Sequence, residues 1–241
     1  MRCVSKPSHI ALKIFFQPIK LLCCFFRVLC LSTKTFTGVI HVNYTQPFTR
    51  IAIIGAGKLG SLLGSKWAAC GNLVRYGVRN VNSPRAQRIL DARIENAEVD
   101  SIQSALDFGE FIVLAVPADA MFSILAEYSN TLRGKVILDP SQGSRTLFNG
   151  ARLSFYGINL FGLENLEQPC FGDTPCDLFY CTSGDESVNA RTDQLIGQLG
   201  FRPINIGGLD LTKTLQSLEL LAHSVSQQRR TGHRVAIKIL T

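Results

Sequence analysis

Acidic residues are missing from the first 50 positions of the chain. This stretch holds seven Lys and Arg but no Asp or Glu, out of totals of 25 basic and 18 acidic residues. The remaining residues therefore carry equal numbers of both charges, and the positive charge belongs to the first fifth of the chain. A nucleic-acid-binding protein needs a basic face on its folded domain, so this distribution argues against a nucleic-acid partner.

Metal-ligating patterns are also lacking. The chain has eight Cys and four His, but no C-x-x-C pair and no spacing from which a zinc site could be built. Four of the cysteines lie within the first 30 residues. The other four, Cys70, Cys170, Cys176 and Cys181, are too few and too scattered for a disulfide scaffold. We therefore predict no metal site, and a reducing compartment.

Residues 1–48 form a basic leader. Its cations repeat every seven residues, at Lys6, Lys13, Lys20, Arg27 and Lys34. Seven residues are about two helical turns, so these charges would share one stripe of a helix with apolar residues between them. This pattern is typical of an organelle transit peptide or of a helix on a membrane surface. An unstructured leader with a chance spacing is the third interpretation.

A membrane-spanning helix is disfavoured in this leader. Lys13, Lys20 and Arg27 interrupt the apolar run, and each would cost about 2.5–3.5 kcal/mol at the bilayer centre. Pro18 would also break the helix. We expect a cytoplasmic or mitochondrial protein, with peripheral membrane contact through residues 1–35 as the alternative.

The pattern changes after Pro47. Residues 51–54 are a short apolar run typical of a buried parallel strand. The sequence G-x-G-x-x-G follows at Gly55–Gly60, then apolar residues at helical spacing as far as Gly71, then a second strand at 73–78. A strand, this glycine motif, a helix and a strand within about 30 residues form the dinucleotide-binding fingerprint.

Each glycine of the motif has an expected role. Gly55 permits a tight turn, Gly57 lets the backbone approach a pyrophosphate, and Gly60 lets the helix pack close to the strand. The phosphates would bind at the N-terminus of the helix that starts near Lys58. A P-loop is excluded because Ser61, not Lys, follows Gly60. A glycine-rich turn that binds nothing is the alternative.

The end of the second strand lacks a carboxylate. Enzymes selective for NAD place Asp or Glu there to bind the ribose 2′-hydroxyl, whereas here the first carboxylate is Asp91. Arg79 stands where a 2′-phosphate would arrive, and a guanidinium can bind phosphate through two hydrogen bonds. Asn80 would donate another hydrogen bond, and Arg85 would add charge. NADP is therefore favoured over NAD, with a solvated loop cation as the alternative for Arg79.

The doubly wound pattern continues to the end of the chain. We predict strands at residues 111–116, 135–139, 154–161, 178–182 and 201–206, and helices at 118–128, 185–199 and 209–226. The fold class is thus α/β, a Rossmann-type, mostly parallel sheet over residues 49–241 with a short C-terminal extension of strands and helix. Ala115, Val116, Pro117 and the turn at 140–143 lie at strand ends, so they should border the nicotinamide.

From Arg50 onward the chain resembles the deazaflavin-dependent NADP oxidoreductases (the coenzyme F-420 family) and the related NADPH domain of the STEAP metalloreductases. The segments that carry the resemblance are Ile51–Gly60, Gly77–Asn80, Val113–Pro117, Leu199–Pro203 and Gly207–Leu209.

The resemblance implies a site for NADP and a hydride transfer with a flavin or deazaflavin partner. The site residues it implies are Gly55, Ala56, Gly57, Lys58, Leu59 and Gly60, with Arg79 and Asn80 on the 2′-phosphate. Because the cofactors carry the chemistry of such a transfer, no catalytic side chain is assigned.

Two departures from the family pattern keep a second hypothesis open. Val78 replaces the small hydroxyl residue usual before the arginine, and the turn after Asp139 reads Pro-Ser-Gln-Gly without the usual Asn. The alternative is a non-catalytic sensor or interaction module that binds NADP(H).

A pyrroline-5-carboxylate reductase or hydroxyacid dehydrogenase is disfavoured. Those enzymes need a substantial helical C-terminal domain, and only 33 residues remain from Leu209. His223, in the last predicted helix, is expected to be a packed or surface residue and not a catalytic one. The sequence leaves open the electron acceptor and the oligomeric state, with a homodimer among the alternatives.

Overall fold

The computed structural model describes residues 48–140, 154–159, 162–229 and 234–240. Residues 1–47 of the leader, the turn at 141–143 and the last two residues of the strand predicted at 154–161 lie outside these residues. In the part that is described, no helix is long and apolar enough to cross a membrane.

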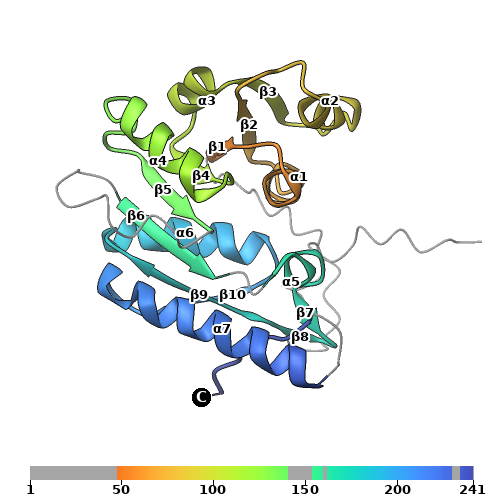
Figure 1. The fold of residues 1–241 in the computed structure, drawn as a ribbon, viewed down its shortest axis with the longest axis vertical. Helices are drawn as coiled ribbons and strands as arrows, with labels where there is room; N and C mark the ends of the chain where they lie inside the picture. The colour runs from red at the N-terminus through yellow and green to blue at the C-terminus, as the bar shows by residue number, and fades with distance from the viewer. Residues whose placement is uncertain (1–47, 141–153, 160–161, 230–233, 241) are drawn as a thin grey trace, which may run out of the picture. The chain divides into compact units, whose positions relative to one another are not determined.

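The first half of the body alternates strands and helices (Figure 1). Its elements are β1 (Arg50–Ile54), α1 (Lys58–Ala69), β2 (Leu73–Val78), α2 (Pro84–Asp91), β3 (Ala97–Ser101), α3 (Ile102–Phe108), β4 (Phe111–Leu114), α4 (Ala118–Glu127), β5 (Val136–Asp139) and β6 (Ser154–Asn159).

The second half adds short strands and longer helices. Its elements are α5 (Leu163–Glu167), β7 (Cys170–Phe171), β8 (Thr174–Pro175), β9 (Asp177–Thr182), α6 (Glu186–Gln198), β10 (Arg202–Asn205), a 3-10 turn (Leu209–Leu211) and α7 (Thr212–Arg229).

Eight of the strands form one sheet, in the order β10-β9-β6-β5-β4-β1-β2-β3. Strands β1 to β6 are all parallel, and their spatial order, β3-β2-β1-β4-β5-β6, is the Rossmann order. Strand β9 then pairs antiparallel with β6, and β10 pairs parallel with β9. The predicted doubly wound, mostly parallel sheet with a C-terminal extension is therefore confirmed.

Burial on both sheet faces explains the apolar runs of the central strands. Ile51 and Ile53 pack on one face with Leu63 and Trp67 of α1. The alternate β1 residues, Ala52 and Ile54, pack on the other face with residues of α3 and α4. Because a parallel strand covered on both sides exposes neither set of side chains, it shows no polar alternation.

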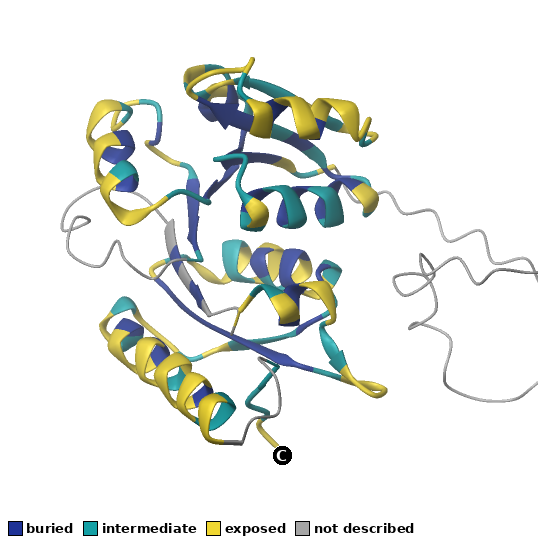
Figure 2. Cartoon of the chain, turned by 45° about the vertical axis from the view of Figure 1, so that its right-hand side comes forward, coloured by how far each residue is buried: buried dark blue, intermediate teal, exposed yellow. Residues whose placement is uncertain are grey.

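Helix α7 covers the C-terminal extension of the sheet. Its Leu215 is buried against Phe179 and Cys181 of β9. The alternate β9 residues, Leu178 and Tyr180, belong to the cluster that contains α6. Helices α6 and α7 therefore lie on opposite faces of β9, and the side of α7 away from the sheet is exposed (Figure 2).

Several predicted strand ends differ from the structure by one residue, and the end of β4 differs by two. Strand β4 ends at Leu114, two residues earlier than the predicted end at Val116. The backbone N–H of Ala115 still donates to the carbonyl of Ile54 at 2.9 Å. Pro117 then caps α4 without any side-chain hydrogen bond. Ala115 and Val116 are consequently loop residues at the sheet edge.

A buried carboxylate attaches the C-terminal residues to the sheet. Asp177 of β9 is fully buried. It accepts two hydrogen bonds from the Arg202 guanidinium and one from the backbone N–H of Ile239, all at 2.7 Å, and Lys238 Nζ lies 3.4 Å away. Burial by itself would raise the pKa of Asp177, but the hydrogen bonds from Arg202 and Ile239 and the charge of Lys238 hold it below its ordinary value.

We expect Asp177→Asn to lower the free energy of unfolding at pH 7 by about 1.5–3 kcal/mol, because the buried carboxylate loses its charge and the partly exposed Arg202 guanidinium loses its anion. A lowered carboxyl pKa gives stability that is present above the pKa of the unfolded chain and lost as pH falls through the folded value. The deficit of the variant should therefore shrink on going from pH 7 to pH 3 in urea unfolding curves. Asp173→Asn, at an exposed turn position, is the matched control. Equal stability of the two variants at pH 7 would contradict the assigned role of Asp177.

Candidate nucleotide-binding site

Gly55 forms the tight turn after β1. Its φ is +112°, a conformation that only glycine adopts easily. Its N–H donates to the carbonyl of Gly77 at the end of β2, at 3.0 Å. A Cβ atom at Gly55 would lie 2.5 Å from the carbonyl oxygen of Ala115. The turn therefore touches the ends of both neighbouring strands, β2 and β4.

Gly60 lets the first turn of α1 pack against this loop. It is buried, and a Cβ there would lie 2.3 Å from the Gly55 carbonyl oxygen and 3.2 Å from the Ala115 Cβ. The turn and packing geometry expected of Gly55 and Gly60 is thus present. That the motif binds a dinucleotide remains a prediction at this point.

Gly57 differs from the other two glycines because it faces open space. It is the N-cap of α1, and a Cβ at this position would have no heavy atom within 4 Å. No side chain caps the helix, and its first turn contains no acidic residue. The first N–H groups of a helix have no acceptor within the helix, and they carry its positive dipole end. The start of α1 at Lys58, Leu59 and Gly60 is therefore open to an anion.

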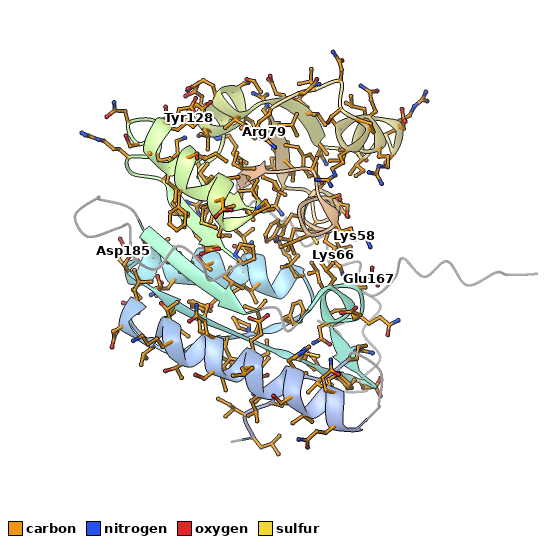
Figure 3. All side chains as sticks on the ribbon, in the orientation of Figure 1. Lys58, Lys66, Arg79, Tyr128, Glu167 and Asp185 are labelled. Carbon is orange, nitrogen blue, oxygen red and sulfur yellow. The ribbon has the colours of Figure 1, made fainter. Side chains whose placement is uncertain are left out.

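Arg79 and Asn80 follow β2 directly, and both are exposed. Because β2 pairs in parallel with β1, they follow the same edge of the sheet as the glycine turn. Arg79 is labelled in Figure 3. The side-chain oxygen of Asn80 accepts from the backbone N–H of Asn82 at 2.9 Å. This bond orients the amide and leaves its NH2 group as a donor.

Arg79 contrasts with Arg75, the arginine within β2. The Arg75 guanidinium binds Glu98 at 2.7 Å and lies 4.4 Å from the ring centroid of Phe108. Among the described residues, Arg79 has no ion pair or hydrogen bond. Arg75 therefore has a structural role, whereas the Arg79 guanidinium is available to an anionic ligand.

Asp100 is a carboxylate near this edge that sequence reasoning missed. It is distant in sequence from β2, but it lies opposite Gly77 in the β2–β3 register. It accepts from Ser104 Oγ at 2.5 Å and from the Ser101 backbone N–H at 2.6 Å. The hydrogen bond from Ser104, followed by that from Ser101, lowers the pKa of Asp100. The carboxylate therefore organises the start of α3.

The loop after β4 forms the other side of the glycine turn. Ala115 and Val116 are half-buried and Pro117 is exposed. The Val116 Cγ1 atom lies 2.9 Å from the point where a Gly55 Cβ would stand. The structure therefore brings Ala115–Pro117 against Gly55, at the place where the strand order reverses. In open α/β sheets this is where ligands bind.

Two polar residues named in the sequence analysis, neither of them a predicted site residue, lie outside the glycine turn and the loop after β4. Asp139 at the end of β5 is fully buried. His223 is exposed on α7 and borders an open hollow of about 200 Å³ together with Glu164 and Glu219. Within the described ranges, no group of His, Cys, Asp or Glu side chains could hold a metal ion.

The strand order, the glycine turn and the open N-terminus of α1 define a Rossmann-type dinucleotide-binding domain. The comparison with protein families agrees with this class. Residues 50–143 match the family described as NADP oxidoreductase, coenzyme F420-dependent. The resemblance to the deazaflavin-dependent NADP oxidoreductases is thus confirmed over that segment, and the resemblance to the STEAP metalloreductases stays a prediction.

Curated relatives are glycerol-3-phosphate dehydrogenases [NAD(P)+]. The protein of Geobacter sulfurreducens is 24% identical over 228 residues, which cover 80% of this chain and 64% of the relative. That of Pseudomonas syringae pv. tomato is 27% identical over 103 residues, which cover 39% of this chain and 30% of the relative. The chain thus spans less than two thirds of the length of these relatives.

Solved structures share the fold. A protein of Arthrobacter sp. FB24, provisionally described as an F420-dependent NADP-reductase, has a TM-score of 0.64 at 16% identity. The match covers 80% of this chain and 99% of that one. The imine reductase of Myxococcus stipitatus in complex with NADP+ has a TM-score of 0.58 at 20% identity, covering 75% of this chain and 63% of that one.

Proposed function

We propose that this protein is an NADP(H)-dependent oxidoreductase, which transfers hydride between NADPH and a small acceptor. A flavin or deazaflavin is the acceptor class favoured by the family match. The observation that carries the proposal is Arg79. It is an exposed cation at the end of β2, unpaired in the described part of the chain, at the position where a carboxylate would select NAD.

The described residues fit this cofactor. The open space in front of Gly57 would admit the pyrophosphate, and the N–H groups at Lys58, Leu59 and Gly60 would bind it. Arg79 and Asn80 would bind the 2′-phosphate. These contacts are charge-assisted hydrogen bonds, which are roughly twice as strong as neutral ones.

The contribution of this chain to the reaction would be to position the cofactor relative to the acceptor. When bound, NADP(H) supplies or accepts the hydride. The loop Ala115–Pro117 would support the nicotinamide end of the cofactor against Gly55, while the start of α1 and Arg79 hold its other groups. A cofactor held at several points loses little further freedom when the acceptor arrives, and such positioning accounts for much of an enzyme's acceleration.

An NADPH oxidation screen tests the proposal. We expect absorbance loss at the NADPH band with at least one class of acceptor among flavins, ferric chelates and quinones. NADPH should be oxidised at least ten times faster than NADH under subsaturating conditions. Tight NADPH binding without oxidation by any acceptor would instead favour the sensor or interaction module. Absence of binding would refute both.

A further inference from the structure

The carboxyl end of β3 carries a carboxylate that the proposed cofactor contacts do not use. Asp100 is half-buried and lies opposite Gly77 in the β2–β3 register, and Arg79 follows Gly77 by two residues. Strand β3 is the next strand outward from β2 (Figure 1). Asp100 therefore lies at the same edge of the sheet as Arg79 and the glycine turn, one strand beyond them.

Two hydrogen bonds hold this carboxylate in a fixed position. The backbone N–H of Ser101 donates to Oδ1 at 2.6 Å, and Ser104 Oγ donates to Oδ2 at 2.5 Å. A carboxylate oxygen can accept two hydrogen bonds, so each oxygen can still accept one from a ligand. Both bonds, that from Ser104 foremost, lower the pKa of Asp100. The carboxyl group is therefore ionised at neutral pH and acts only as an acceptor.

The segments that follow β2 and β3 also carry apolar side chains. Val81, in the turn after β2, is 39% exposed, and Ile102, which follows β3, is half-buried. Adjacent strands lie about 4.8 Å apart, so the two segments leave the sheet close together. This edge therefore offers a flat aromatic ring apolar contact next to a fixed acceptor. A ring with an amino group at its rim matches both features.

The order of the groups in a dinucleotide matches the order of the strands, which is β4-β1-β2-β3 in this half of the sheet. The proposed contacts put the nicotinamide beside the end of β4, the pyrophosphate at the start of α1 after β1, and the 2′-phosphate at Arg79 after β2. The adenine is attached to the ribose that carries the 2′-phosphate, on the side away from the pyrophosphate. It would therefore lie at the end of β3.

We infer that the end of β3 binds the adenine of the cofactor, and that Asp100 accepts a hydrogen bond from the adenine amino group. This amino group is a donor on the rim of the base, whereas the carboxylate is an acceptor only. Hypoxanthine has a carbonyl oxygen in place of the amino group, and that oxygen would face the carboxylate with no donor between them. Asp100 is therefore a specificity-determining residue for the base. The inference rests on the proposed binding of NADP(H), but not on its oxidation.

Fluorescence titration of the full chain with NADPH and with its hypoxanthine analogue tests the inference. The wild type should bind the analogue about tenfold more weakly, because a hydrogen bond to a charged group is lost and two acceptors are brought together. NADH and its hypoxanthine analogue should give the same ratio of dissociation constants, since the 2′-phosphate is not involved. Asp100→Asn should reduce this ratio to less than about threefold, because an amide offers a donor as well as an acceptor.

Glu98→Gln is the matched control, because Glu98 is the other carboxylate of β3, two residues before Asp100, and it pairs with Arg75. It should leave the ratio at the wild-type value. Circular dichroism and the melting temperature check that both variants fold, and the wild-type ratio needs no variant. Equal binding of NADPH and its analogue by the wild type, or an equal effect of the two variants, would overturn the inference alone. If the wild type binds neither NADPH nor NADH, the inference and the proposed function both fail.

Discussion

Replacing Arg79 with Ala is expected to reduce NADPH affinity about 10- to 100-fold while changing NADH affinity less than threefold. The lost contact is a charge-assisted hydrogen bond, for which about 1.5–3 kcal/mol is typical. NADH has no 2′-phosphate and loses nothing. The intact protein should bind NADPH at least tenfold better than NADH, and the variant should bind both about equally. Fluorescence titration measures the four dissociation constants, those of NADPH and NADH for the wild type and for the variant.

Arg133→Ala is the control for this substitution. Arg133 is also exposed, but it precedes β5 and so lies at the amino end of the parallel strands, away from the glycine turn. Its removal subtracts the same charge from the protein and should leave the preference for NADPH intact. If the wild type binds NADPH and NADH equally, the assignment of NADP is wrong, whatever the variants do.

Gly57→Val is expected to abolish the binding of both cofactors, with affinity losses of about 100-fold or more, and to leave the folded protein intact. Among the described residues, no heavy atom lies within 4 Å of the point where a Cβ at Gly57 would stand, so the β-carbon of a valine is accommodated without a clash. It would occupy the space through which a pyrophosphate approaches the start of α1. We expect a melting temperature within about 3 °C of the wild type.

Gly197→Val is the matched control, because Gly197 of α6 is likewise a position where a Cβ would meet no atom within 4 Å. It should fold and bind NADPH like the wild type. The two site variants should affect the two cofactors differently. Arg79→Ala should weaken the binding of NADPH alone, whereas Gly57→Val should weaken the binding of both NADPH and NADH. If Gly57→Val folds normally and still binds NADPH tightly, the phosphates do not lie at the start of α1.

The strands with the clearest sequence signal are those buried on both sides. Strands β1, β4 and β5 are four or five residues long, and nearly all of their side chains are buried. Burial on both faces requires apolar residues at nearly every position, and such a run is easy to recognise in the sequence. The glycine motif was predictable for a similar reason, since the contacts of Gly55 and Gly60 exclude any other residue.

Most of the missed elements lie at the β3 edge of the sheet, although α5 and the β7–β8 pair were missed as well. Strand β3 reads Ala-Glu-Val-Asp-Ser and is only half-buried, so its apolar signal is weak. The flanking helices, α2 and α3, are short, and their clearest sequence signals are the serine caps, Ser83 and Ser101. Asp100 was overlooked because its place beside Gly77 depends on strand pairing, not on sequence distance. The attachment of Lys238 and Ile239 to Asp177 joins residues about 60 positions apart, a pairing that no local pattern encodes.

That attachment also sets an order in which the protein can be completed during its synthesis. Domains form from the N-terminus as the chain is made, and the parallel strands β1 to β6 can pair with one another early. Strand β9 carries a carboxylate that stays without two of its partners until residues 238 and 239 have been made. The strands beside the glycine turn can therefore pair before the last residues are made, whereas the far edge of the sheet reaches its final stability last.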